Sequence, residues 1–233
     1  MNCIITGGTK GIGKACALLF AKNGFNVAIC ARDKAALNEM SAQLHDANPT
    51  GKHLAISCDV RDRAQLHSFG ENCLKAYGSI DVLINNAGVF LPGNITEEAE
   101  GTLEFLIETN VYSAYHLTRQ IVPVMRTAKK GYIFNICSVA SINSYDGGGS
   151  YAISKFALLG FTKNLRHELK TDNIRVTAVL PGAVLTPSWD GTPLPESRFI
   201  PADDIATLIL QAYQLSDRTV VEEILIRPQL GDL

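Results

Sequence analysis

Thr6-Gly7-Gly8-Thr9-Lys10-Gly11-Ile12-Gly13 stands between the first apolar run of the chain and its first helical pattern. The run 3–6 has the composition of a buried strand, and residues 11–23 have the apolar spacing of a helix. A glycine-rich turn at this place lets backbone N–H groups and a helix dipole approach a pyrophosphate. The stretch therefore indicates a nucleotide-binding α/β fold. An ordinary tight turn is the alternative, because the spacing departs from G-x-G-x-x-G.

The same alternation of short apolar runs and helical patterns continues along the chain. Seven strands joined by helices predict a single doubly wound (Rossmann-type) α/β domain over residues 1–233, with a seven-stranded parallel sheet and helices on both faces. Ligands of such folds bind outside the carboxyl ends of the strands. After the first strand, the expected strands lie at 26–30, 54–57, 82–84, 132–137, 174–179 and 221–226, and the other expected helices at 34–47, 62–77, 97–121 and 202–214, with one more carrying Tyr151.

The segment 182–201 is the least regular part of the chain and holds its only tryptophan. Its length suggests a short lid over a substrate, with simple surface decoration as the alternative.

The composition narrows the classes of function. With 46% hydrophobic residues, 19% charged residues and a formal net charge of −2, the chain is typical of a globular protein and has no basic surface for nucleic acid. No apolar run approaches the roughly 18 residues of a membrane span, and no secretory signal precedes the first strand. Six scattered cysteines form no metal pattern and favour a reducing compartment. We expect a cytoplasmic protein with a small-molecule substrate, no membrane contact and no metal.

A second stretch, Tyr151-Ala152-Ile153-Ser154-Lys155, begins another helical pattern. Residues four apart share a helix face at roughly 5 to 6 Å between Cβ atoms, so an ammonium is expected beside a phenol. A neighbouring cation lowers the phenol pKa from about 10, which would make Tyr151 a general acid near neutral pH. Taken alone, the pair also fits a solvated helix surface, so its meaning depends on the other motifs.

Several motifs, each at the end of an expected strand, resemble the short-chain dehydrogenase/reductase family. T-G-x-x-x-G-x-G matches 6–13, the adenine-contacting pair matches 59–60, N-N-A-G matches 85–88, and P-G-x-V-x-T matches 181–186. The resemblance covers almost the whole chain. It implies a nicotinamide dinucleotide held by Gly7, Thr9, Lys10, Gly11, Ile12, Gly13, Asp59, Val60, Asn86, Ala87, Gly88, Tyr151, Lys155, Pro181, Gly182, Val184 and Thr186.

The end of the second expected strand bears on the choice between NAD and NADP. An acidic side chain there would accept from the ribose 2′-OH of NAD, whereas a basic one would meet the 2′-phosphate of NADP. In this chain Ala31 takes the usual place of the family's acid, Arg32 follows it, and Lys10 adds a second cation. NADP(H) is therefore the expected cofactor. The alternative is that Arg32 is solvated and Asp33 only caps the next helix.

Asn110, Ser138, Tyr151 and Lys155 match the family's catalytic tetrad in type, order and approximate spacing. A carbonyl that receives a hydride gathers negative charge on its oxygen, so Tyr151 would protonate that oxygen and Ser138 would hydrogen-bond it. The resemblance implies that Lys155 lowers the pKa of Tyr151 and binds the nicotinamide ribose, and that Asn110 holds a water linking the lysine to solvent. We therefore expect an NADPH-dependent reductase that converts a small-molecule ketone to an alcohol.

Reduction of 3-oxoacyl groups on an acyl carrier protein is one alternative. Such reductases usually have a basic residue for the acidic carrier near the end of the helix that follows the active-site tyrosine, where this chain has Asp172. Arg126, Lys129 and Lys130 could still supply a basic patch or belong to a solvated turn. A non-catalytic NADPH-binding sensor is an alternative of another class, which the intact tetrad argues against.

The end of the chain and the run 186–189 resemble those of bacterial sepiapterin-reductase-like members. This resemblance suggests Asp232 as an anchor for the amino-pyrimidine edge of a pterin and Trp189 as a cover for a flat ring. An exposed, inert Asp232 and a Trp189 that only packs the lid are the alternatives. Family members usually pair the long helices carrying Asn110 and Tyr151 with a second subunit, so a homodimer or homotetramer is expected.

Overall fold

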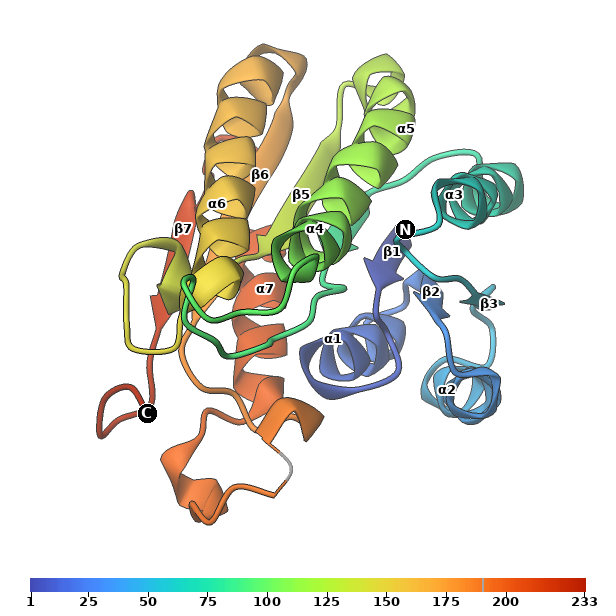
Figure 1. The fold of residues 1–233 in the computed structure, drawn as a ribbon. Helices are drawn as coiled ribbons and strands as arrows, with labels where there is room; N and C mark the ends of the chain where they lie inside the picture. The colour runs from blue at the N-terminus through green and yellow to red at the C-terminus, as the bar shows by residue number, and fades with distance from the viewer. Residues whose placement is uncertain (190) are drawn as a thin grey trace.

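The computed structural model describes residues 1–189 and 191–233, so position 190 of the expected lid lies outside the described residues. Seven strands form one parallel sheet in the order β3-β2-β1-β4-β5-β6-β7 (Figure 1). The order reverses between β1 and β4, which makes a crevice at their carboxyl ends. The predicted fold class is confirmed. The strands are β1 (Asn2–Thr6), β2 (Asn26–Ala31), β3 (Leu54–Ser57), β4 (Val82–Asn85), β5 (Gly131–Ile136), β6 (Ile174–Pro181) and β7 (Glu223–Ile226).

Helices cover both faces of the sheet because successive strand residues alternate between two cores. Ile5 and Ile29 pack with α1, α2 and α7, whereas Ile4 and Ile133 pack on the other face with α3, α5 and α6 (Figure 1). The longer helices are α1 (Gly11–Lys22), α2 (Lys34–Ala47), α3 (Arg63–Tyr77), α5 (Ser113–Ala128), α6 (Gly149–Leu169) and α7 (Ala202–Gln214), and α4 (Thr102–Ile107) is short.

The helix expected at 97–121 differs from the structure. It is divided into α4, a π-helical turn over Glu108–Tyr112, and α5, which continues to Ala128. The Ser113 N–H donates to Glu108 O, and this i→i+5 bond inserts an extra residue that the apolar spacing does not reveal. Asn110 lies inside this turn and is buried.

The last strand is shorter than the expected 221–226. It begins at Glu223, because the Val221 carbonyl accepts a hydrogen bond from the Thr177 hydroxyl instead of joining the ladder.

All six cysteines are free and buried. Within 1–189 and 191–233, no helix has the length and apolar character needed to cross a membrane. The described residues also contain no cluster of three or more His, Cys, Asp or Glu side chains placed to hold a metal ion.

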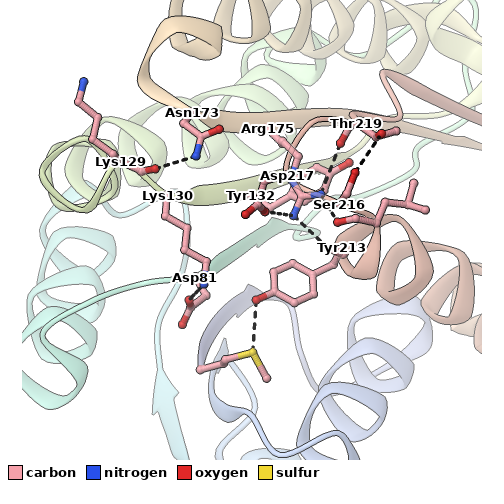
Figure 2. Close-up of polar contacts among 12 residues, drawn as sticks. Asp81, Lys129, Lys130, Tyr132, Asn173, Arg175, Tyr213, Ser216, Asp217 and Thr219 are labelled. Atoms are coloured by element: carbon pink, nitrogen blue, oxygen red, sulfur yellow. Dashed lines mark hydrogen bonds and ion pairs between the residues drawn. The ribbon is translucent and has the colours of Figure 1, made fainter.

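An arginine braces the amino-terminal edge of the sheet (Figure 2). Arg175 in β6 donates to the carbonyls of Tyr213 and Leu215, both at 3.0 Å, where α7 ends. Its guanidinium lies 4.3 Å from the centroid of the Tyr132 ring, and 12% of its side chain is exposed. These contacts satisfy carbonyls that the end of a helix leaves without partners.

We expect Arg175→Met to lower the free energy of unfolding by about 1–2 kcal/mol, because an exposed and a partly buried carbonyl lose their charged donor. Urea denaturation measures the change. Lys163→Ala is the matched control: it removes an ion pair to Glu223 from a lysine side chain that is 60% exposed, so a change below about 0.5 kcal/mol is expected. If Arg175→Met and Lys163→Ala changed the free energy of unfolding equally, the stabilising role of Arg175 would be contradicted.

Candidate functional site

A cavity of about 810 Å³ opens at the carboxyl ends of the central strands. Of the residues that the sequence analysis singled out, those lining it are Gly7, Lys10, Gly11, Ile12, Asn86, Ala87, Gly88, Ser138, Tyr151, Lys155, Pro181, Gly182, Val184, Thr186, Trp189 and Asp232. Those outside its wall are Thr9, Gly13, Arg32, Asp59, Val60 and Asn110. Segments far apart in the sequence therefore meet at one crevice.

The glycine-rich turn after β1 requires glycine for both its backbone conformation and its packing. Gly7 and Gly11 have φ values of +68° and +49°, in the left-handed region that side chains rarely adopt. A Cβ atom on Gly11 would lie 2.6 Å from Thr186 Cγ2, and one on Gly13 would overlap the Gly7 carbonyl oxygen. The bare backbone of this turn, at the start of α1, is what a phosphate group needs for a close approach.

The loop after β4 is bonded directly to the glycine turn. The Thr6 hydroxyl accepts from the N–H groups of Asn86 and Ala87 at 3.0 and 2.9 Å. The Asn86 side-chain amide donates to Thr6 O at 2.9 Å and Gly7 O at 3.0 Å. The sequence predicts that Asn86 contacts the cofactor. In the structure its side-chain amide fixes the shape of the crevice.

Two charged residues lie at the outer end of the crevice. Arg32 is exposed, while Asp33 caps α2 by accepting from the N–H of Ala35 at 2.9 Å, so the capping role is confirmed. The hydrogen-bonded guanidinium of Arg61 lowers the pKa of Asp59, and Arg32 contributes to the same shift from nearby. Arg32 and Asp59 are therefore neighbours at the ends of β2 and β3.

Tyr151, Ser138 and Lys155 meet at the inner end of the cavity. Burial raises the pKa of the Tyr151 phenol, and the Ser138 side chain partly offsets this. The Ser138 oxygen accepts from the Ala140 N–H at 3.1 Å, so its own proton is free to be donated.

Lys155 lies near the Tyr151 ring and is bonded to the backbone. Its Nζ lies 5.7 Å from the Tyr151 ring centroid and donates to Ile136 O at 2.9 Å. Burial dominates the pKa of the Tyr151 phenol and Ser138 opposes it, so the effect of Lys155 on that pKa stays a prediction. Burial also lowers the pKa of Lys155 itself, to about 8.

Asn110 braces the site from behind the cavity wall. Its Oδ1 accepts from the Val89 N–H at 2.8 Å, and its Nδ2 donates to Val89 O at 3.1 Å and to Ser154 Oγ at 2.9 Å. The Ser154 hydroxyl in turn donates to Tyr151 O at 2.7 Å. The π-helical turn, the loop after β4 and the start of α6 are joined through this one side chain.

Aromatic side chains form one wall of the cavity. Phe90 contacts the edge of Tyr151 with 4.9 Å between ring centroids and lies 6.1 Å from Trp189 at an interplanar angle of 31°. Trp189 also packs on Phe199 at 5.2 Å. Trp189 therefore both lines the cavity and packs the lid. Phe90 was not predicted as a site residue, although its position just after N-N-A-G could have indicated that it lines the cavity.

The opposite wall carries an ion pair from the C-terminal segment. Asp232 Oδ2 accepts from Arg227 Nε at 2.8 Å, and Asp232 Oδ1 lies 2.9 Å from the place of a Cβ on Gly182. Asp232 thus lines the cavity with a side chain that is 44% exposed. Its partner Arg227 was not anticipated, because nothing in the local sequence reveals which cation an exposed carboxylate meets.

The reversed strand order, the glycine turn over a helix N-terminus and the half-buried phenol near a serine define a dinucleotide-type crevice joined to a polar pocket. The chain belongs to the short-chain dehydrogenase family, whose model matches residues 2–194. It is an oxidoreductase of a family that uses nicotinamide cofactors.

Named relatives cover nearly the whole chain. The chain is 33% identical over 99% of its length to a sepiapterin reductase of Chlorobaculum tepidum, of which it covers 97%. It is 34% identical over 89% of its length to a 3-oxoacyl-acyl-carrier-protein reductase of Thermotoga maritima, of which it covers 88%. A metagenomic short-chain oxidoreductase solved in complex with NADP has a TM-score of 0.86 and 30% identity, with 99% of this chain and 98% of that chain covered.

We expect Lys155→Met to stabilise the protein at neutral pH. A pKa of about 8 for Lys155 in the folded state, below the roughly 10.4 of a free lysine, means that folding opposes its charged form. This cost is complete below about pH 8 and disappears as the pH rises through about 10. The substitution should raise the free energy of unfolding by about 1–2 kcal/mol at pH 6.5, net of the lost bond to Ile136, and by less at pH 9.5. Urea denaturation at both pH values tests this, and a variant less stable than wild type at pH 6.5 would contradict it.

Proposed function

We propose that this chain is an NADPH-dependent reductase that converts the ketone of a small molecule to an alcohol. The observation that carries the proposal is a phenol kept protonated by burial, with a serine side chain beside it, in the same cavity as the glycine turn. A carbonyl oxygen that gains charge needs a proton donor and a fixed hydrogen-bond donor, and Tyr151 and Ser138 have these roles.

Lys155 and Asn110 complete the proposed catalytic set. The nicotinamide cofactor, when bound, supplies the hydride. Lys155 binds the ribose hydroxyls next to the phenol, and its lowered pKa of about 8 suits a group that passes protons onward near neutral pH. Asn110 holds the start of α6 in place and, as in the family, orders a water on the path from Lys155 to solvent. The buried phenol and lysine argue against a pure NADPH sensor, because binding alone requires neither.

The proposed cofactor is NADP(H). Arg32 and Lys10 are exposed at the outer end of the crevice, where a 2′-phosphate would meet them, and no acid replaces Ala31. The remaining proposed contacts are those named from the family's motifs, with Asp59 and Val60 at the adenine and Thr186 at the carboxamide. The 30% identical oxidoreductase solved with NADP supports the same choice.

For the substrate we propose a compact molecule with a flat ring and a polar edge. Phe90 and Trp189 offer an aromatic wall, and the pair of Asp232 and Arg227 offers a charged one. The 33% identity to a sepiapterin reductase supports a pterin-like ligand, with Asp232 as its anchor and Trp189 over its ring. The segment 182–201 is then the lid of this single domain.

The carrier-protein alternative receives less support. Asp172 accepts from Arg126 Nε at 2.8 Å and Lys129 Nζ at 3.0 Å. Lys130 pairs with Asp81 at 3.5 Å (Figure 2). Two carboxylates therefore partly offset the charge of the three basic residues that would attract an acidic carrier, and Arg126 and Lys129 share one of them. The named 3-oxoacyl-acyl-carrier-protein reductase keeps this reaction as the second candidate.

We further propose a homodimer or homotetramer in the cytoplasm. Large apolar side chains are exposed along the π-helical turn and α5 and on the first turns of α6: Tyr112 at 51%, Tyr115 at 38%, Ile153 at 40% and Phe156 at 48%. Such a patch is typical of an interface. Six free cysteines support a reducing compartment.

Replacing Tyr151 by Phe should lower kcat by about 10²- to 10⁴-fold while the dissociation constant for NADPH changes less than about twofold. The measurement is turnover on a carbonyl panel of diketones, pterins and 3-oxoacyl thioesters, with NADPH fluorescence for binding. Tyr77→Phe, which removes a phenol remote from the cavity, is the control. Absence of turnover by the wild-type protein on the whole panel would favour the sensor.

Replacing Arg32 by Ala should raise KM for NADPH by about 10- to 100-fold, because a hydrogen bond to a charged group contributes roughly 1.5–3 kcal/mol. KM for NADH should stay unchanged, since NADH has no 2′-phosphate. Lys22→Ala, at the far end of α1, controls for the loss of one surface charge. Equal effects on both cofactors would remove Arg32 from the phosphate site.

A further inference from the structure

The helix that carries Tyr151 is capped by a carboxylate from another part of the chain. The residue before α6 is Gly148, which has no side chain to cap it. Glu98, in the loop between β4 and α4, accepts from the Ser150 N–H at 2.9 Å, and its other oxygen accepts from the Ser150 hydroxyl. The first N–H groups of a helix lack partners within it, and the helix dipole favours a negative charge there.

The surrounding backbone is built closely around this carboxylate. The Gly93 N–H donates to Gly147 O at 2.9 Å, which joins the two loops beside the cap. A Cβ on Gly93 would lie 2.7 Å from Glu98 Cγ, and one on Gly149, whose φ is +36°, would overlap Glu98 Oε1. Glycine is required at position 149, where a Cβ would also overlap the Gly93 carbonyl oxygen, and at Gly93 a Cβ would displace the Glu98 side chain. The contact is therefore a packed clamp.

The clamp lies one residue from the phenol. Tyr151 follows Ser150, and the loop that contains Glu98 also places Phe90 against the Tyr151 ring in an edge-to-face contact. In Figure 1 this green loop passes the start of α6, drawn in yellow. Glu98 does not line the cavity, so it acts through Ser150 and the first turn of the helix.

We propose that Glu98 is a positioning residue for proton transfer: its cap on α6 holds the phenol of Tyr151 against the hydroxyl of Ser138. This inference rests on the proposed reductase function. Proton transfer depends steeply on geometry, so a first turn that frays lowers the chemical step while the glycine turn and the end of β2, which hold the cofactor, are unaffected.

Three substitutions separate the length of the side chain from its charge. Glu98→Gln keeps the length and an oxygen that accepts from the Ser150 N–H, Glu98→Asp keeps the charge but is one methylene shorter, and Glu98→Ala removes both. Glu97→Ala is the matched control, since Glu97 is the preceding carboxylate and accepts from the Asn94 side chain of its own loop at 3.0 Å. Each protein is assayed for kcat, for NADPH affinity by fluorescence, and for hydrogen–deuterium exchange of peptides covering 149–155.

We expect Glu98→Ala and Glu98→Asp to lower kcat by about 10- to 100-fold with NADPH affinity within about twofold of wild type. Glu98→Gln should keep kcat within about fivefold of wild type, because the length of the side chain, and not its charge, allows it to cap the helix. Exchange at 149–155 should accelerate by about tenfold in the Ala and Asp variants, since capping contributes about 1 kcal/mol or more, and should not change in Glu97→Ala.

Unchanged exchange at 149–155 in Glu98→Ala, or faster exchange with unchanged kcat, would overturn the proposal. Equal losses of kcat and of NADPH affinity would also overturn it, because they indicate general loss of structure. A wild-type protein without turnover on any carbonyl is a different result: the proposed function and the positioning role then fail together, while the exchange data still decide whether Glu98 caps α6.

Discussion

The site depends on the hydrogen bonds that join the ends of β1 and β4. The strand order reverses there, so the two following loops diverge and nothing in the sheet itself holds them together. The Thr6 hydroxyl and the Asn86 amide supply four hydrogen bonds between these loops. Because the glycine turn has no side chains of its own at Gly7 and Gly8, its shape is imposed from the neighbouring loop.

Burial sets the chemistry at the other end of the crevice. The pKa of the Tyr151 phenol is raised and the pKa of the Lys155 ammonium is lowered, so desolvation moves each group toward its neutral form. Single contacts offset this cost: Ser138 on the phenol and the Ile136 carbonyl on the ammonium. In the proposed reaction, such a phenol keeps its proton until a substrate oxygen needs it, and the lysine releases its proton more readily than a free lysine does. Functional sites commonly concentrate such opposing shifts.

Local patterns predicted the strands and the positions of the motifs, because alternation and glycine turns depend on near neighbours. The fold class and the gathering of Gly7, Ser138 and Tyr151 at one edge followed from the rule for parallel sheets. What could not be predicted depends on contacts distant in sequence. The π-helical turn at Asn110 reflects its bonds to Val89 and Ser154, and the role of Asn86 as a brace reflects the carbonyl of Gly7. The pairing of Asp172 with Arg126 likewise joins residues 46 positions apart.

The two edges of the sheet differ in whether their basic side chains have partners within the chain. At the amino-terminal edge, Lys130 is paired with Asp81, and Arg175 is bonded to the carbonyls at the end of α7. These cations stabilise the fold and produce little electrostatic potential that a partner would meet. At the carboxyl edge, Arg32 and Lys10 are exposed beside a glycine turn. A chain with a formal net charge of −2 therefore still offers local positive potential where a phosphorylated ligand would enter. Since a ligand responds to the local field and not to the total charge, the acidic balance of the sequence and the proposed preference for NADPH are compatible.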